Sequence, residues 1–386
     1  MCRRIGILAV VLVACGEQDL GVLVGAEPFG RPPPGAEVEL DWERAAEPFV
    51  DGQGSSDGAS AEIATLGPSF AELPSPRFAG IVHGLDGFLY AVPARARRFL
   101  RIDPDAPELA ELFGPELPDG EWGGAAVSTS GVIYLAPLRQ TRVFAFDPAD
   151  PNRAEFVGPD YASLSAPRWR GFVPSLDGRL YALPDAAGSV LAFNPMDPMS
   201  SELLGTSLTG YDGGVLTPDG TIYGIPSDSE RILAAMGERA ELEGPLLGPG
   251  ADKFSAGVLS PEGDVFAFGK QSRAVLSFAI ESPLNPQQRG TLNGDAPYFV
   301  RSSALAGDGR LYAAPAGADG VVRFDSRLPG ELETFATDTN GWRGLMLTAR
   351  GDLFAAPYTA DRLLRIQPQS EPVPWASVLS PFFNYY

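Results

Sequence analysis

The sequence predicts an all-β fold: a seven-bladed β-propeller of four-stranded blades, closed by a terminal strand. One short phrase returns seven times, a Gly-containing turn followed by an apolar-aromatic step and usually a Pro. The aromatic positions of the copies are Tyr90, Tyr134, Tyr181, Tyr223, Phe266, Tyr312 and Phe354. They lie 42 to 47 residues apart. A period of about 44 residues, with several short strands in each repeat, is typical of propellers.

The composition agrees with one large domain of this kind. The chain has 386 residues, of which 44% are apolar and 10% aromatic, and it contains 45 Gly and 37 Pro. Such a composition suits a folded body made of short strands and turns. The length alone suggests two or three domains, but seven repeats of about 44 residues fill almost all of the chain after residue 60. We therefore expect a single propeller over residues 61–386.

The strands of the first blade show the pattern that the others repeat. An Asp-Gly pair supplies the tight turn between the first two strands, because its Gly accepts a positive φ angle. The expected first strand, turn, second, third and fourth strands are residues 78–84, 85–87, 88–92, 99–103 and 109–113. Blades stack face to face, so both faces of each sheet are covered, which explains why apolar residues outnumber polar ones.

A propeller must also close its ring, because an open ring exposes two strand edges. Residues 61–67 resemble the expected fourth strands at 154–158 and 202–205, and they precede the first strand of the first blade. We therefore expect residues 61–67 to form the outer strand of the seventh blade. The competing candidate is the aromatic segment 373–386.

The hairpin that follows each Pro carries a second regular pattern. An Arg and an apolar residue are followed by an apolar residue and Asp-Pro, as in Arg98-Phe99 with Ile102-Asp103-Pro104. These offsets resemble the NHL repeat and the SMP-30-like propellers. Where the NHL pattern has Asp, this chain has Pro93, Pro137, Pro184, Pro226, Gly269, Pro315 and Pro357. The resemblance implies a propeller and no particular activity.

The two cysteines both lie in the first fifteen residues. Residues 1–4 are basic, and residues 5–14 are apolar but too few to span a bilayer. Leu12, Val13 and Ala14 precede Cys15, which resembles a bacterial lipobox. The resemblance implies that residues 1–15 are a lipoprotein signal peptide with Cys15 as the site of lipid attachment. An ordinary secretory signal that contains a cysteine is the alternative.

Export to the bacterial cell envelope follows from either interpretation. Gly16 stands where an inner-membrane retention signal has Asp, so the outer membrane is favoured. Residues 16–60 are rich in Pro and Gly without sustained periodicity and are expected to be a flexible tether. Such a tether reaches roughly 35 to 40 Å.

The net charge of −20 bears on possible partners. Nucleic acid is excluded, because a protein that binds phosphates needs a basic surface to release counterions. An acidic surface keeps a protein soluble and monomeric, and we expect a monomer. Attraction of a cationic partner is the alternative reading of the charge.

No catalytic motif is found. The only histidine, His83, aligns across the repeats with Val127, Pro174, Leu216, Leu259, Leu305 and Leu347. It is therefore expected to pack inward, and catalysis by a Ser-His-Asp triad is excluded. The repeated aspartates precede Gly in turns or Pro in loops, where they have structural explanations. We expect no metal and no cofactor.

Candidate site residues come from a position that differs between repeats. The residue before the Gly of the first strand, or aligned with it where Ala256 and Ser302 replace the Gly, is Ala79, Gly123, Arg170, Asp212, Ser255, Arg301 or Arg343. In a propeller this position lies near one mouth of the central channel. Arg170, Asp212, Arg301 and Arg343 are thus expected to form a polar cluster for an anionic or sugar-like ligand. Solvated or blade-bridging arginines are the alternative.

The residue one position earlier is a tryptophan in three repeats. Trp122, Trp169 and Trp342 could stack on a ligand at the channel mouth. The alternative is that they form an aromatic ring in the core between blades.

Two functional hypotheses remain. The first is an exported, lipid-anchored propeller that binds a small ligand or an envelope protein and has no chemistry of its own. The second is a propeller enzyme of the lactonase or lyase type that uses the channel mouth. Three or more converging carboxylate or Asn oxygens would favour the enzyme, whereas Arg and aromatic groups without such convergence favour binding.

Overall fold

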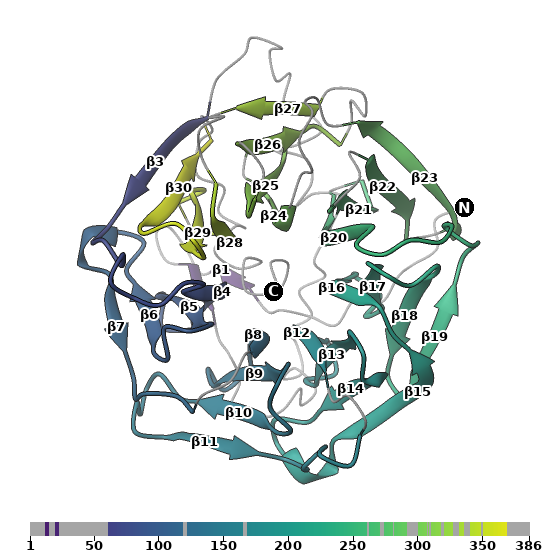
Figure 1. Ribbon diagram of the computed structural model, residues 1–386, viewed down its shortest axis with the longest axis horizontal. Helices are drawn as coiled ribbons and strands as arrows, with labels where there is room; N and C mark the ends of the chain where they lie inside the picture. The colour runs from purple at the N-terminus through teal and green to yellow at the C-terminus, as the bar shows by residue number, and fades with distance from the viewer. Residues whose placement is uncertain are drawn as a thin grey trace.

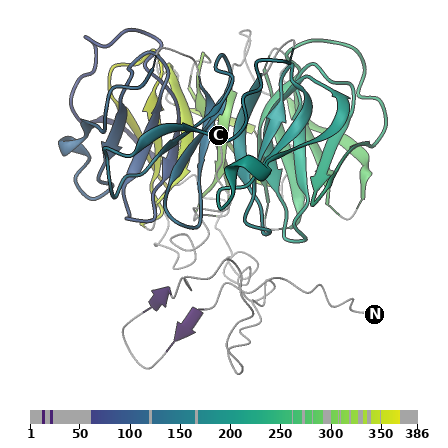
Figure 2. The same cartoon turned by 90° about the horizontal axis from the view of Figure 1, so that it is seen from below.

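The computed structural model describes residues 12–14, 20–22 and 61–368, apart from 119–121, 165–167, 261, 271–273, 281, 292–299, 307, 309, 318–319, 327–331, 336–339 and 349. Over the described residues, seven four-stranded antiparallel sheets surround a central axis (Figure 1). The seven-bladed propeller is therefore confirmed. Seen from the side, the strands run between the two faces of the ring (Figure 2). Cys15 and the expected tether at 16–60 lie almost wholly outside the described residues.

The strands of each blade follow one another from the axis outward. The first three blades are β4 (Phe78–His83), β5 (Leu89–Pro93), β6 (Phe99–Ile102) and β7 (Glu111–Phe113); β8 (Trp122–Val127), β9 (Ile133–Pro137), β10 (Val143–Phe146) and β11 (Ala154–Val157); and β12 (Trp169–Pro174), β13 (Leu180–Pro184), β14 (Gly188–Phe193) and β15 (Glu202–Leu208). The next three are β16 (Tyr211–Leu216), β17 (Ile222–Pro226), β18 (Ile232–Met236) and β19 (Arg239–Glu243); β20 (Phe254–Leu259), β21 (Asp264–Gly269), β22 (Ala274–Ala279) and β23 (Ser282–Thr291); and β24 (Val300–Leu305), β25 (Leu311–Pro315), β26 (Val321–Phe324) and β27 (Leu332–Phe335).

The seventh blade joins the two ends of the ring. It contains β28 (Trp342–Leu347), β29 (Leu353–Pro357), β30 (Leu363–Gln367) and, on the outside, β3 (Glu62–Leu66). β3 pairs antiparallel with β30 and lies next to it in Figure 1, purple beside yellow. β28 in turn lies beside β4 of the first blade. The prediction that the segment at 61–67 closes the ring is confirmed, and segment 373–386 lies outside the described residues.

Elements outside the blades are few among the described residues. Short 3-10 helices span η1 (Pro107–Leu109) and η2 (Pro198–Ser200). β1 (Leu12–Ala14) and β2 (Leu20–Val22) form a separate two-stranded sheet. In the described part of the chain, no helix has the length and apolar character required to cross a bilayer.

Burial explains the apolar composition of the second strands. Every residue of β5, β9, β13, β17, β25 and β29 is buried, because neighbouring blades cover both faces. The repeated Asp and Tyr of the sequence form one structural unit. The hydroxyl of Tyr90 donates to Asp86 across 2.6 Å, and that of Tyr312 donates to Asp308 across 2.7 Å. These turn aspartates are thus engaged within their own blades.

The repeated Arg of the third strand also has a structural role. Arg98 Nε donates to the carbonyl oxygen of Gly114, and Arg231 Nε donates to that of Gly244. Each guanidinium therefore holds the end of the fourth strand of its blade. In the seventh blade, Arg362 donates to the carbonyl oxygen of Gly67, which follows β3. The same contact that completes other blades thus joins the two ends of the ring.

Candidate functional site

A β-bulge at the start of each first strand positions the candidate residues. The pairing of all seven first strands with their second strands is irregular at this point. Gly171 and Gly344 follow the candidate arginines and have φ angles of 60° and 66°. A Cβ atom at Gly344 would lie 2.5 Å from the backbone nitrogen of Ile81 in the next blade. The bulge therefore favours Gly at Gly171 and Gly344, and it redirects the side chain before each of them.

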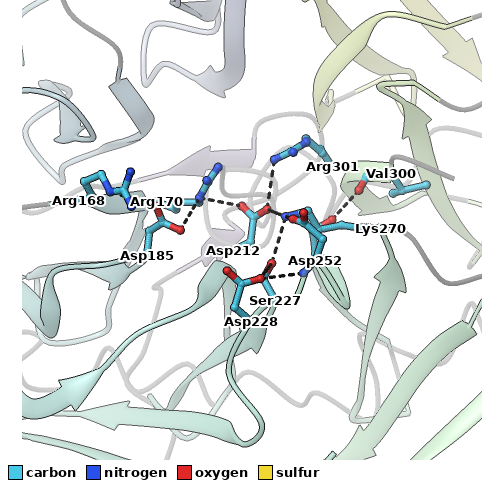
Figure 3. A network of polar contacts seen from close by, with 11 residues as sticks. Arg168, Arg170, Asp185, Asp212, Ser227, Asp228, Asp252, Lys270, Val300 and Arg301 are labelled. Carbon is cyan, nitrogen blue, oxygen red and sulfur yellow. Dashed lines mark hydrogen bonds and ion pairs between the residues drawn. The ribbon is translucent and has the colours of Figure 1, made fainter. Parts of the chain in front are cut away.

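Asp212 lies at the centre of a group of cations (Figure 3). Its carboxylate oxygens lie 2.8 Å from Lys270 Nζ, 3.3 Å from Arg301 Nη1 and 3.9 Å from Arg170 Nε. These residues come from four successive blades, the third to the sixth. Burial alone raises the pKa of Asp212, but the charges of Arg170, Lys270 and Arg301 outweigh it and bring that pKa well below its ordinary value. Asp212 is therefore ionised over the whole physiological range.

Lys270 follows β21 and is almost fully buried, with 2% of its side chain exposed. Its ammonium also lies 2.5 Å from Asp252 Oδ1 and donates to Ser227 Oγ across 3.1 Å. The hydrogen bond from Lys270 lowers the pKa of Asp252. The three donors of the ammonium are thus matched by three acceptors.

A third carboxylate extends the group toward the third blade. Asp185 follows β13 and lies 3.3 Å from Arg170 Nε and 3.6 Å from Arg168 Nε. Arg170 therefore bridges Asp185 and Asp212. We use the term charged cluster for the following residues: Arg170, Asp185, Asp212, Asp252, Lys270, Arg301 and Arg343.

Arg343 is the member of the charged cluster without a carboxylate partner among the described residues. Its guanidinium carbon lies 3.6 Å from the centroid of the Tyr358 ring, a cation–π contact. Its Nε atom is buried and has no hydrogen-bond partner in the described part of the chain. Burial, together with the charge of Arg301, lowers the pKa of Arg343 to about 10. Arg343 is therefore a cation that the protein holds at an electrostatic cost.

The structure brings together several residues that the sequence analysis singled out. Arg170 and Arg301 form ion pairs with Asp212. The charges of these three residues also act on the pKa of Arg343. Whether they bind a ligand stays a prediction.

Other members of the charged cluster were missed, although a signal existed. The residue after the last residue of each second strand also differs between blades. It is Ala94, Leu138, Asp185, Ser227, Lys270, Ala316 or Tyr358. Second strands end where first strands begin, so this position faces the same mouth.

The three tryptophans belong to the core. Trp122, Trp169 and Trp342 are 3%, 0% and 5% exposed. The indole nitrogens of Trp169 and Trp342 donate to the carbonyl oxygens of Ser189 and Arg362. Neighbouring residues of a strand point in opposite directions. An arginine directed to the channel mouth therefore places the preceding tryptophan between blades, and we exclude these tryptophans from the site.

His83 is the last residue of β4, at the opposite end of its strand from the charged cluster. It pairs in register with Leu89, as Leu347 pairs with Leu353, which confirms the alignment of the repeats. Its Nδ1 lies 2.9 Å from the carbonyl oxygen of Gly84, and burial lowers its pKa. Among the described residues, no three His, Cys, Asp or Glu side chains gather as a metal site would require.

The class of protein is thus a closed seven-bladed propeller with a charged cluster at one mouth. No family model and no curated protein matches the sequence. Solved structures share the fold at low identity. A streptogramin B lyase is 11% identical with a TM-score of 0.66, and the match covers 80% of this chain and 97% of that one.

Two further structures place this fold in different settings. Virginiamycin B lyase from Staphylococcus aureus is 9% identical with a TM-score of 0.66, over 79% of this chain and 99% of that one. The extracellular domain of a protein described as a hybrid two component system from B. thetaiotaomicron is 11% identical with a TM-score of 0.58, over 79% of this chain and 42% of that one. These identities establish the fold alone.

Proposed function

We propose that this propeller is a binding module for a small anionic ligand, held by the charged cluster at the mouth of the ring. One observation carries the proposal: Arg343 is a half-buried cation whose buried Nε atom has no hydrogen-bond partner among the described residues. An uncompensated buried charge is costly, so a protein that keeps one gains from a counter-ion. A ligand carboxylate would supply that counter-ion.

The balance of charge indicates what kind of ligand fits. Within the charged cluster, Arg170, Lys270 and Arg301 are matched by Asp185, Asp212 and Asp252. Arg343 adds one positive charge on a chain whose net charge is −20. A planar guanidinium forms paired hydrogen bonds with a carboxylate, and Tyr358 keeps the plane of Arg343 fixed from one side. A monoanionic carboxylate, including that of an acidic sugar, suits this arrangement.

The enzyme hypothesis receives less support from the same residues. In one neighbour, a virginiamycin B lyase, a histidine-to-alanine variant is described as catalytically inactive. The single histidine of this chain, His83, lies at the opposite end of its strand from the charged cluster. Asp212 and Asp252 are held ionised by cations, which makes them poor general acids and weak general bases. Binding is therefore the function that these side chains support best.

Replacing Arg343 tests the binding proposal. In Arg343→Met, we expect the affinity for benzoate and glucuronate to fall by about tenfold or more, because a charge-assisted hydrogen bond is lost. We also expect the free energy of unfolding to rise by about 1 kcal/mol, because a half-buried cation with an unpaired Nε atom is removed. Isothermal titration and urea unfolding measure the two effects.

A matched control is Arg168→Met. Arg168 pairs with Asp185 near the same mouth, but 52% of its side chain is exposed. Its loss should change the affinity by less than about threefold, as expected for an exposed ion pair. Equal losses in the two variants, or unchanged affinity in Arg343→Met, would contradict the proposal.

We also propose that the module is lipid-anchored at the bacterial cell envelope, on the basis of Cys15 and the residues before it. In Cys15→Ser, lipid labelling should disappear and the protein should leave the membrane fraction. Cys2→Ser is the control, because Cys2 lies within the segment that a signal peptidase removes. Fractionation with radiolabelled fatty acid measures both. Membrane attachment that survives in Cys15→Ser would show that the thiol carries no anchor.

A further inference from the structure

Lys270 is held between two carboxylates that differ in how they are anchored. Asp212 stands on β16, its side chain is 16% exposed, and it also pairs with Arg170 and Arg301. Asp252 comes from the loop between β19 and β20, and 41% of its side chain is exposed. Removing Asp212 would leave Arg301 without a carboxylate partner among the described residues. When Asp252 leaves Lys270, Asp212 remains as the counter-ion of Lys270.

The loop that carries Asp252 has an unusual backbone. Gly248 and Gly250 have φ angles of 84° and 143°, and Asp252 itself has a φ of 52°. The backbone N–H of Asp252 donates to Asp228 Oδ1 across 2.7 Å. Asp252 therefore reaches Lys270 from a connection between blades, whereas the other two carboxylates of the charged cluster belong to strands or directly follow them.

We propose that Asp252 occupies the position on Lys270 that the carboxylate of the ligand takes in the complex. This inference rests on the proposed binding function. The side chain of Lys270 is 2% exposed and keeps Asp212 when Asp252 leaves, so the donor that Asp252 vacates must meet another acceptor, and an anionic acceptor also restores the lost charge. A neutral ligand cannot make that exchange. Asp252 thus acts as a specificity-determining residue that restricts the site to anions.

Neutralising Asp252 should strengthen anion binding. In Asp252→Asn, benzoate no longer competes with an internal carboxylate, and we expect about tenfold tighter binding, equivalent to ~1.4 kcal/mol. Asn accepts the left-handed backbone of this position, so the loop is retained. The control is Asp185→Asn, which removes the same charge from the cluster but leaves the partners of Lys270 in place. Its affinity for benzoate should rise by less than about threefold.

A second measurement follows Lys270 directly. The chain contains only two lysines, Lys253 and Lys270, so lysine labelled with ¹³C and ¹⁵N gives two side-chain signals. Lys253→Arg assigns them. We expect saturating benzoate to shift the Cε and Nζ signals of Lys270, and Asp252→Asn to shift the same signals without ligand.

The outcomes separate the inference from the proposed function. Two results together support the replacement of Asp252 by the ligand carboxylate, which we call the exchange. They are tighter binding of benzoate in Asp252→Asn and a shift of the Lys270 signals when benzoate is added. If the wild type binds benzoate but Asp252→Asn gains no more than Asp185→Asn, or the Lys270 signals stay in place, the exchange is wrong and the binding function stands. If neither benzoate nor glucuronate binds any variant, the binding function fails and the exchange fails with it.

Discussion

A chain that lacks residues 1–66 is expected to unfold at a temperature about 10 °C or more below that of a chain that lacks residues 1–60. The two differ by β3, which forms the whole outer strand of the seventh blade. Its loss bares the edge of β30 and uncovers the core of that blade, against which Ile63 packs. An exposed strand edge also recruits other chains. We therefore expect the shorter chain to self-associate and to have a lower midpoint of thermal unfolding.

Differential scanning calorimetry and light scattering measure these two effects. The chain without residues 1–60 is the control, because it keeps β3 and should remain monomeric. If the two truncated chains unfold at the same temperature, another segment covers β30. The aromatic segment 373–386 would then become the candidate for that role.

The architecture could be predicted because each blade repeats the same packing problem. A side chain that faces a neighbouring blade meets the same surroundings seven times, so Leu89, Ile133 and Leu353 recur at one register position. On the first strand, His83 pairs with Leu89, and it is recognised as a packing residue only because its counterparts in the other blades, such as Leu347, are apolar. The closing strand was predictable for the same reason, since residues 62–66 resemble other outer strands.

The charged cluster was predictable only in part, because a functional site differs from the repeat. Arg170, Asp212 and Arg301 share one register position and could be found by comparing blades. Lys270 occupies a different position, just beyond the residue that ends each second strand. That residue is Pro in six blades, and the repeated Pro makes this part of the repeat look uniform. Asp252 comes from a connection between blades, and connections have no register that an alignment of repeats can use.

The ionisation of Asp212 gives the charged cluster a pH dependence that can be measured. The carboxyl is ionised in the folded protein well below the pKa of about 3.9 that it has when unfolded. The stability that it contributes is therefore fully present above about pH 5 and is lost progressively as the pH falls below about 4. In Asp212→Asn, this part of the acid dependence should be absent. Urea unfolding between pH 3 and pH 7 compares the two proteins.

At neutral pH, Asp212→Ala is expected to lower the free energy of unfolding by about 3 to 5 kcal/mol, because removing the shared carboxylate weakens the charge balance of Lys270 and Arg170 and leaves Arg301 uncompensated. Lys270 retains Asp252 and Arg170 retains Asp185, whereas Arg301 forms no ion pair with another carboxylate within the described residues. Asp105→Ala is the matched control: its ion pair with Arg350 joins side chains that are 59% and 63% exposed and should contribute less than about 1 kcal/mol. If the two variants lost equal stability, the charged cluster would contribute no more than a surface ion pair. In that case the cost of holding Arg343 could not be offset by the network around Asp212.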